Sequence, residues 1–128
     1  MIQDDIRVVI IDDEEGVREM LGDAVDAFGY RAFIAASGAQ GLREVQERRP
    51  QVVLLDLTMP GVDGHTVFQQ LIGSSVPSSI VIVSGNNDEA AARGLLQRGA
   101  FDYVTKPIDL GHLQSVITAA AAAAAQPS

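Results

Sequence analysis

The stretch VVIIDDEE, from Val8 to Glu15, places four apolar residues directly before four carboxylates. A second run, VVLLD from Val52 to Asp56, repeats the pattern with a single acid at its end. Both runs are apolar at successive positions, which is typical of a parallel strand that is covered on both faces. Two such strands that lead into acidic residues indicate an α/β protein with carboxylates at one edge of its sheet.

Outward from these runs, candidate strands and helices alternate. We predict strands at Arg7–Ile11, Arg31–Ile34, Val52–Asp56, Ile80–Ser84 and around Tyr103–Val104. We expect five helices. The first has Val17, Met20, Leu21, Ala24, Val25 and Phe28 on one face and Gly29 at its end, the second is Ala39–Arg48 with Ser37 as its cap, and the third is Gly64–Ile72. The fourth runs from Asn87 or Asp88 to about Arg98, and the fifth is capped by Asp109 and carries Leu110, Leu113, Val116 and Ile117. A strand followed by a helix, repeated along the chain, predicts a doubly wound parallel sheet.

Length and composition restrict the class of protein. The 128 residues suffice for one domain with a real core. A net charge of −8 argues against nucleic-acid binding by this domain, and the longest apolar stretch is too short to cross a membrane. The absence of cysteine and of a signal peptide fits a cytoplasmic protein. The alanine-rich stretch Thr118–Ala125 is interpreted as the end of a helix.

Polar side chains follow the predicted strands at their carboxyl ends, where ligand sites of such sheets lie. They are Asp12 and Asp13 after the first strand, Asp56 after the third, Ser84 after the fourth, and Lys106-Pro107 after the fifth. The helix macrodipole, which stabilises acids at a helix start by about 0.3–1 kcal/mol, accounts for Glu14 and Glu15. For Asp12 and Asp13 we favour a hard divalent cation, and Mg²⁺ fits because it accepts carboxylates and leaves positions for phosphate oxygens.

The other residues at this edge of the sheet, which we call the rim, each have a structural and a functional interpretation. Asp56 could cap a turn, but a carboxylate beside Mg²⁺ can be a nucleophile toward a phosphoryl group. Lys106 is the only lysine among nine basic residues, which favours a role for its compact charge on a phosphate oxygen or carboxylate. Ser84 could mark a turn or donate to a phosphoryl oxygen, and Tyr103 could be core or a rotamer switch. Pro107 is expected to hold the loop, and a cis bond before it is one way to do so.

Taken together, these motifs resemble the receiver domain of bacterial two-component response regulators. The motifs are Asp12-Asp13, D-x-x-M-P-G-x-D-G at 56–64, S-G at 84–85 and Y-x-x-K-P at 103–107. The resemblance spans about residues 5 to 120. We assign residues 1–120 to this domain and residues 121–128 to a helix end and linker toward an effector domain. The resemblance implies a flavodoxin-like fold with strand order 2-1-3-4-5.

The resemblance also implies roles. Asp56 would accept a phosphoryl group from a phosphohistidine on a sensor histidine kinase or phosphotransfer protein. Asp13, Asp56 and the Thr58 carbonyl would ligate Mg²⁺, which Asp12 would support directly or through water. Ser84 and Lys106 would bind phosphoryl oxygens, and Ser84 with Tyr103 would relay the change to the surface of the fourth helix, fifth strand and fifth helix. A phosphorylation-dependent homodimer is compatible with the family, although no sequence feature fixes the oligomeric state.

The sequence argues against three other functions. A phosphohydrolase of the haloacid dehalogenase type needs a second aspartate two residues after the nucleophile, and Thr58 stands there. A flavodoxin-like FMN binder needs a Ser/Thr/Gly loop after the first strand, where this chain has DDEE. A docking module that never reacts would not need Asp12, Asp13, Asp56, Ser84 and Lys106 together.

Overall fold

The strands form a single sheet in which every neighbouring pair is parallel. The computed structural model describes residues 6–57, 64–85 and 87–125. The strands are β1 (Arg7–Ile11), β2 (Arg31–Ala35), β3 (Val52–Asp56), β4 (Ser79–Ser84) and β5 (Asp102–Thr105). They lie in the order β2-β1-β3-β4-β5, which confirms the predicted doubly wound, flavodoxin-like fold.

Both faces of the central strands are buried, as their continuous apolar runs predicted. Val8 to Ile11 of β1 and Val52 to Leu55 of β3 have at most 1% of their surface exposed. Because side chains alternate along a strand, Val9 and Ile11 join one core cluster and their neighbours join the other. The sheet therefore separates two hydrophobic cores.

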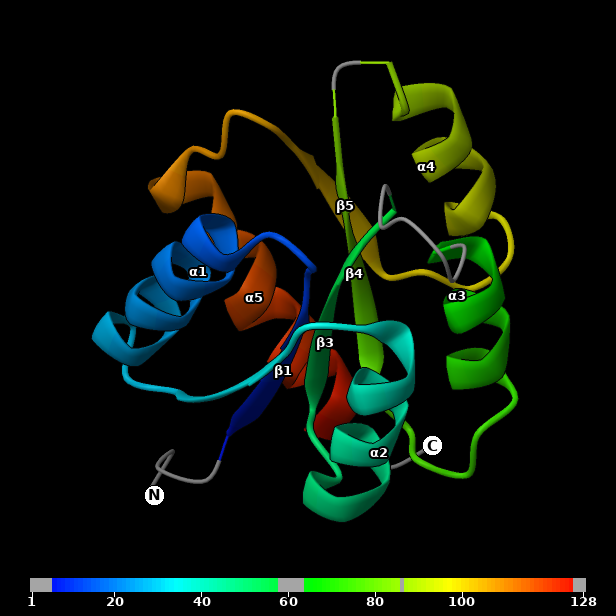
Figure 1. Cartoon of the computed structure of the whole chain (residues 1–128), viewed down its shortest axis with the longest axis horizontal. Helices are drawn as coiled ribbons and strands as arrows, with labels where there is room; N and C mark the ends of the chain where they lie inside the picture. Colours follow the sequence, from blue (N-terminus) through cyan, green and yellow to red (C-terminus); the bar gives the residue numbers. More distant parts are fainter. Residues whose placement is uncertain (1–5, 58–63, 86, 126–128) are drawn as a thin grey trace.

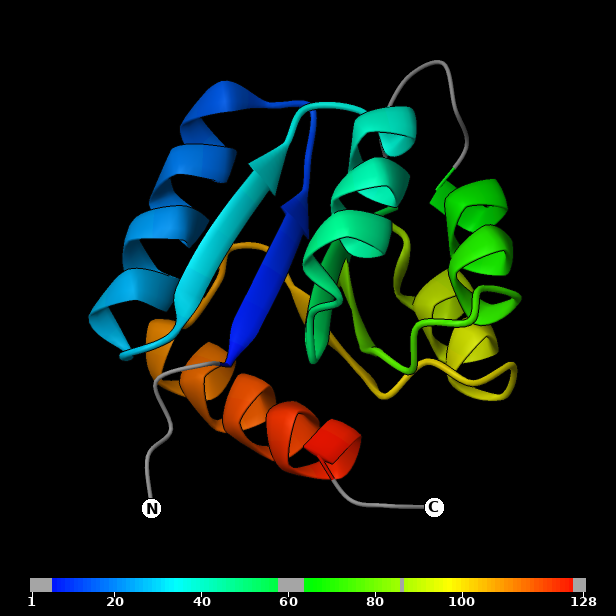
Figure 2. The ribbon, with the colours of Figure 1, turned by 90° about the horizontal axis from the view of Figure 1, so that it is seen from below.

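Five helices cover these two faces (Figures 1 and 2). They are α1 (Glu15–Ala27), α2 (Gly38–Arg48), α3 (Gly64–Ile72), α4 (Glu89–Leu96) and α5 (Leu110–Ala125). α1 and α5 pack on one face through Leu21, Val25, Leu113 and Ile117, and α2, α3 and α4 pack on the other. Each crossover thus returns the chain to the same edge of the sheet, so the carboxyl ends of all the strands lie together.

Local signals in the sequence fix several helix ends. The Ser37 hydroxyl accepts a hydrogen bond from the Gln40 N–H at 3.2 Å, which confirms it as the cap of α2. Asp109 caps α5 in the same way, because its Oδ1 accepts a hydrogen bond from the backbone N–H of His112 at 3.0 Å. α1 ends before Gly29, whose φ of +94° lies in the region that favours glycine.

Some predicted details were wrong. Met20 and Leu110 were expected on buried helix faces, but they are 38% and 47% exposed. Both line a surface pocket instead. Asp88 precedes α4 but makes no capping hydrogen bond with its side chain. α4 ends at Leu96 rather than near Arg98 because the chain tightens into a turn before Gly99.

Two predicted strands were one residue short, since β2 continues to Ala35 and β4 begins at Ser79. β1 and β3 have the predicted bounds, and β5, predicted around Tyr103–Val104, runs from Asp102 to Thr105. The predicted helical stretch Thr118–Ala125 is confirmed as part of α5. Residues 126–128, the end of the predicted linker, lie outside the described residues.

Candidate functional site at the carboxyl edge of the sheet

The parallel sheet brings the predicted site residues to one rim. Asp12 follows β1 directly, Asp56 is the last residue of β3, Ser84 is the last residue of β4, and Lys106 follows β5. Among the polar and charged residues that the structure describes, the buried ones are Asp12, Asp56 and Ser84. Every buried polar side chain of the described chain therefore lies at this rim.

Three carboxylates converge there. Asp12, Asp13 and Asp56 each offer an oxygen, and these oxygens all lie within 4.8 Å of one another. Asp12 is 1% and Asp56 is 2% exposed, whereas Asp13 faces solvent. Since like charges so close repel, the arrangement needs a compensating positive charge.

Burial raises the pKa of Asp12 from 3.8 to about 6. The Glu14 N–H, which donates to Asp12 Oδ1 at 2.9 Å, opposes the rise, whereas the charge of Asp56 adds to it. The ionised form of Asp12 is thus disfavoured by its surroundings until a cation approaches.

The donor set fits Mg²⁺. Oδ2 of Asp12 is a buried oxygen without a hydrogen-bond partner among the described residues. Such an atom is expensive to bury unless a ligand occupies the adjoining space. Carboxylate oxygens from Asp12, Asp13 and Asp56 are hard ligands of the kind that Mg²⁺ binds. Thr58, the further ligand that we predicted, lies outside the described residues.

Lys106 supplies positive charge on the other side of Asp56. Its Nζ lies 3.8 Å from Asp56 Oδ2, and its backbone N–H donates to the Ser84 carbonyl at 2.9 Å. The Ser84 hydroxyl is buried and has no partner among the described residues. The peptide bond before Pro107 is cis. A buried hydroxyl without a partner and an ammonium close to Asp56 thus lie at the same rim, and both are groups that can donate hydrogen bonds to oxygens.

Tyr103 makes a contact that the sequence did not reveal. Its hydroxyl donates to Glu89 Oε2 at 2.9 Å, and Arg93 Nη2 lies 3.1 Å from the same oxygen. The Tyr103 hydrogen bond and then Arg93 hold the pKa of Glu89 below its usual value. The i,i+4 spacing of Glu89 and Arg93 was the only signal available, and it predicts an ion pair but not the tyrosine.

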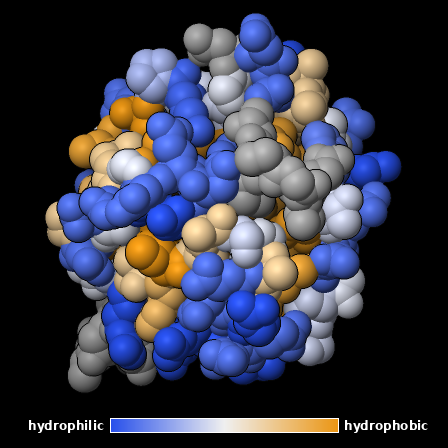
Figure 3. Space-filling view, in the orientation of Figure 1, coloured by the Kyte–Doolittle hydropathy of each residue, from blue (hydrophilic) through white to orange (hydrophobic). Residues whose placement is uncertain are grey.

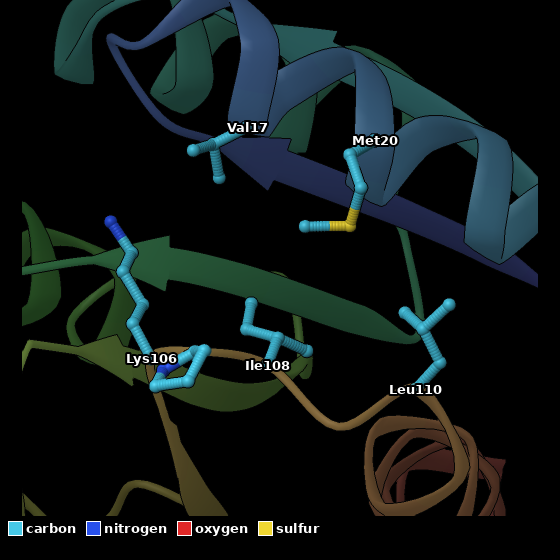
Figure 4. Close-up of a pocket in the computed structure, with 6 residues that line it drawn as sticks. Val17, Met20, Lys106, Ile108 and Leu110 are labelled. Atoms are coloured by element: carbon cyan, nitrogen blue, oxygen red, sulfur yellow. The ribbon is translucent and has the colours of Figure 1, made fainter.

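An apolar pocket of about 440 Å³ opens beside the rim. Val17 and Met20 of α1 face Ile108 and Leu110 across it, and Lys106 lies at one end (Figure 4). In Figure 3, hydrophobic residues are visible at the upper left of the surface, near the segment that leads into α5. Met20 and Leu110, whose exposure the helical pattern did not predict, are part of the lining of this pocket.

No helix within the described residues is both long enough and apolar enough to cross a membrane.

Comparisons with known proteins agree with this geometry. The regulatory protein AtoC of Escherichia coli is 32% identical over 87% of this chain, and the KDP operon transcriptional regulatory protein KdpE of the same organism is 35% identical over 84%. The chain spans about a quarter of AtoC and about half of KdpE. Sporulation initiation phosphotransferase F of Bacillus subtilis is 28% identical, and the match covers 87% of this chain and 90% of that protein.

A solved structure and a family model agree as well. The crystal structure of a response regulator receiver domain protein from Clostridium thermocellum superposes with a TM-score of 0.87 at 25% identity, covering 92% of this chain and 95% of that one. Residues 8–118 match the family model described as the response regulator receiver domain. The chain therefore belongs to the receiver domains of two-component response regulators.

Proposed function

We propose that Asp56 is the phosphoryl acceptor of this receiver domain, with a phosphohistidine of a sensor histidine kinase or phosphotransfer protein as the donor. The observation that carries this assignment is the environment of Asp56: it is buried at the rim, within reach of two other aspartates and 3.8 Å from Lys106. An oxygen of Asp56 forms the new bond to phosphorus while the bond from phosphorus to the imidazole nitrogen breaks. The bonding pair stays on that nitrogen, which then takes up a proton.

The acids define where Mg²⁺ would sit. Asp13 and Asp56 would hold the ion, and Asp12 would support it directly or through water. When bound, Mg²⁺ would neutralise negative charge on the phosphoryl oxygens. The partnerless Oδ2 of Asp12 supports this assignment, because a buried carboxylate oxygen otherwise has nothing to compensate its desolvation. The carbonyl of Thr58 is proposed as a further ligand on the basis of the family resemblance.

Lys106 and Ser84 would receive the phosphoryl oxygens. The Lys106 ammonium already faces Asp56, so it needs little reorganisation to bind a group attached there. The Ser84 hydroxyl is buried and lacks a partner, so a phosphoryl oxygen would satisfy it. Pro107 would keep the loop after Lys106 in place.

A relay toward the surface of α4, β5 and α5 would begin at Ser84. β4 and β5 are paired so that Ile82 lies opposite Tyr103 and Ser84 lies opposite Thr105. Movement of Ser84 toward a phosphoryl group would open space beside β5, and Tyr103 would leave Glu89 to fill it. The α4 surface would then lose one of its hydrogen bonds.

The donor protein must reach Asp56 from the rim, and the pocket beside Lys106 gives it an apolar place to bind. Val17, Met20, Ile108 and Leu110 offer surface whose burial would stabilise a transient complex. This proposal makes the chain a signalling domain that promotes its own phosphorylation and dephosphorylation. An effector domain and a phosphorylation-dependent homodimer remain proposals from the family resemblance.

Phosphorylation can be tested without knowing the kinase. Incubation with Mg²⁺ and acetyl phosphate should add one phosphoryl mass to the intact protein. Asp56→Asn should abolish the addition, whereas Asp23→Asn, an exposed change of the same charge on α1, should not. Labelling that persists unchanged in Asp56→Asn would exclude the assignment. Multiple-turnover hydrolysis of p-nitrophenyl phosphate would instead indicate a phosphohydrolase.

A further inference from the structure

Arg18 reaches back from α1 to the turn that carries the metal-binding acids. Its Nη1 donates to the backbone carbonyl of Asp12 at 3.0 Å, and the contact is partly buried. Arg18 lies one turn into α1, so this bond joins the helix to the residue that follows β1. The function proposed above assigns no role to Arg18.

Asp12 is held at three of its polar atoms. Its N–H donates to the Ala35 carbonyl at 3.1 Å, its Oδ1 accepts from the Glu14 N–H at 2.9 Å, and its carbonyl accepts from Arg18. The atom left over is Oδ2, which is buried and has no partner among the described residues. Of the three restraints, the one from Arg18 is the only one that is made by the side chain of another residue.

We infer that Arg18 is a positioning residue for the magnesium site, because it fixes the turn so that Asp12 and Asp13 keep their carboxylates toward Asp56. This inference rests on the proposed function of the rim. It makes a prediction whose sign is opposite to that of simple electrostatics. The positive charge of Arg18 should by itself weaken the binding of a cation, so its removal should tighten Mg²⁺. If Arg18 acts by positioning, its removal should weaken Mg²⁺.

The two effects have opposite signs, and a matched control measures the effect of the net charge. Salt does not separate them, because Asp12 is buried and Arg18 is partly buried, so their Coulomb interaction is only weakly screened. Arg18→Met changes the net charge from −8 to −9. Arg98→Met makes the same change on an exposed side chain after α4, at the opposite end of the sheet from the rim. Arg18→Gln serves as a second variant if Arg18→Met folds poorly.

The experiment measures Mg²⁺ affinity by calorimetry and amide hydrogen exchange by NMR in the metal-free protein. We expect Arg18→Met to raise the dissociation constant for Mg²⁺ about threefold to tenfold, the size expected for one hydrogen bond. The amides of Asp12 and Glu14 should exchange faster while those of β3 and β4 keep their protection. Arg98→Met should change the affinity by less than about twofold.

Each other outcome is decisive. An unchanged or lower dissociation constant in Arg18→Met overturns the positioning role, because charge alone then explains Arg18. Faster exchange across all strands also overturns it, because Arg18 would then stabilise the whole fold rather than the turn. If the unmodified protein binds no Mg²⁺, the proposed metal site itself fails, and the inference fails with it. The unmodified protein therefore distinguishes the two failures.

Discussion

Replacing Asp12 with asparagine should stabilise the metal-free protein at neutral pH, although it removes a residue of the site. Asp12 is 1% exposed, and burial raises its pKa from 3.8 to about 6. A difference of this size corresponds to about 3 kcal/mol by which folding disfavours the ionised carboxylate. Asparagine carries no charge and keeps an oxygen for the Glu14 N–H. Burying its amide nitrogen without a hydrogen-bond partner costs about 1–2 kcal/mol, so we expect the free energy of unfolding to rise by about 1–2 kcal/mol.

The pH dependence of this gain follows from the direction of the pKa shift. Because the pKa of Asp12 is higher in the folded protein, folding strengthens proton binding at this site. The stabilising contribution of protonated Asp12 is complete below pH 3.8, declines as the pH rises, and is lost above about pH 6. The advantage of Asp12→Asn should therefore be largest above about pH 6 and should shrink toward pH 4.

Urea unfolding followed by far-ultraviolet circular dichroism, in EDTA, gives the free energies of unfolding. With an m value of about 2 kcal/mol per molar urea, the midpoint of Asp12→Asn should rise by about 0.5–1 M at neutral pH. Asp23→Asn, which removes an exposed charge from α1, should stay within about 0.5 kcal/mol of the unmodified protein. Added Mg²⁺ should stabilise the unmodified protein more than Asp12→Asn and narrow the gap. An Asp12→Asn protein that is no more stable than the unmodified one at neutral pH without metal would refute this reasoning.

Three further substitutions test other parts of the rim. Gly64→Ala would place a Cβ 2.8 Å from the Leu57 Cα, so we expect a loss of about 1–3 kcal/mol in unfolding experiments together with slower labelling by acetyl phosphate. Lys106→Met removes the ammonium 3.8 Å from Asp56, the proposed acceptor, and stopped-flow or quench measurements should show phosphorylation slowed by at least about tenfold. Glu89→Ala removes the acceptor of the Tyr103 hydroxyl, and ¹⁹F NMR of fluorotyrosine-labelled protein should show the Tyr103 signal shifted without phosphorylation; an unchanged signal would mean that Glu89 does not hold this side chain.

The sequence was sufficient for the fold because its main determinants are local. The apolar runs at 8–11 and 52–55 are typical of strands covered on both faces, and both are almost fully buried. Caps such as Ser37 and Asp109 mark where helices start, and each makes the hydrogen bond that its residue type predicts. The strand order came from the family resemblance, since propensity and periodicity do not determine which parallel strands are neighbours.

The candidate site could be predicted in part for the same reason. A parallel sheet carries every residue that follows a strand to one edge, so the convergence of Asp12, Asp56 and Lys106 needed only correct strand ends. The contacts of Glu89 with Tyr103 and of Arg18 with the Asp12 carbonyl were not predicted, because they depend on side-chain rotamers across separate elements. The exposure of Met20 was missed because helical periodicity places it on the apolar face beside the buried Leu21 but does not show whether another element covers it.

The burial of Asp12 also links the affinity of the site for metal to pH and to the stability of the fold. A carboxylate with a pKa of about 6 holds a proton over a pH range in which an exposed aspartate is fully ionised, so protons would compete with the proposed Mg²⁺ for it below neutrality. Lys106 lowers the pKa of Asp12, whereas Asp56 and Asp13 raise it. A phosphoryl group added at Asp56 would bring further negative charge and engage Lys106, which would raise the demand for a cation at the same moment. Under the proposed function, the rim would be least satisfied without metal and best satisfied when metal and phosphoryl group are present together, which is the property that a phosphorylation-driven switch requires.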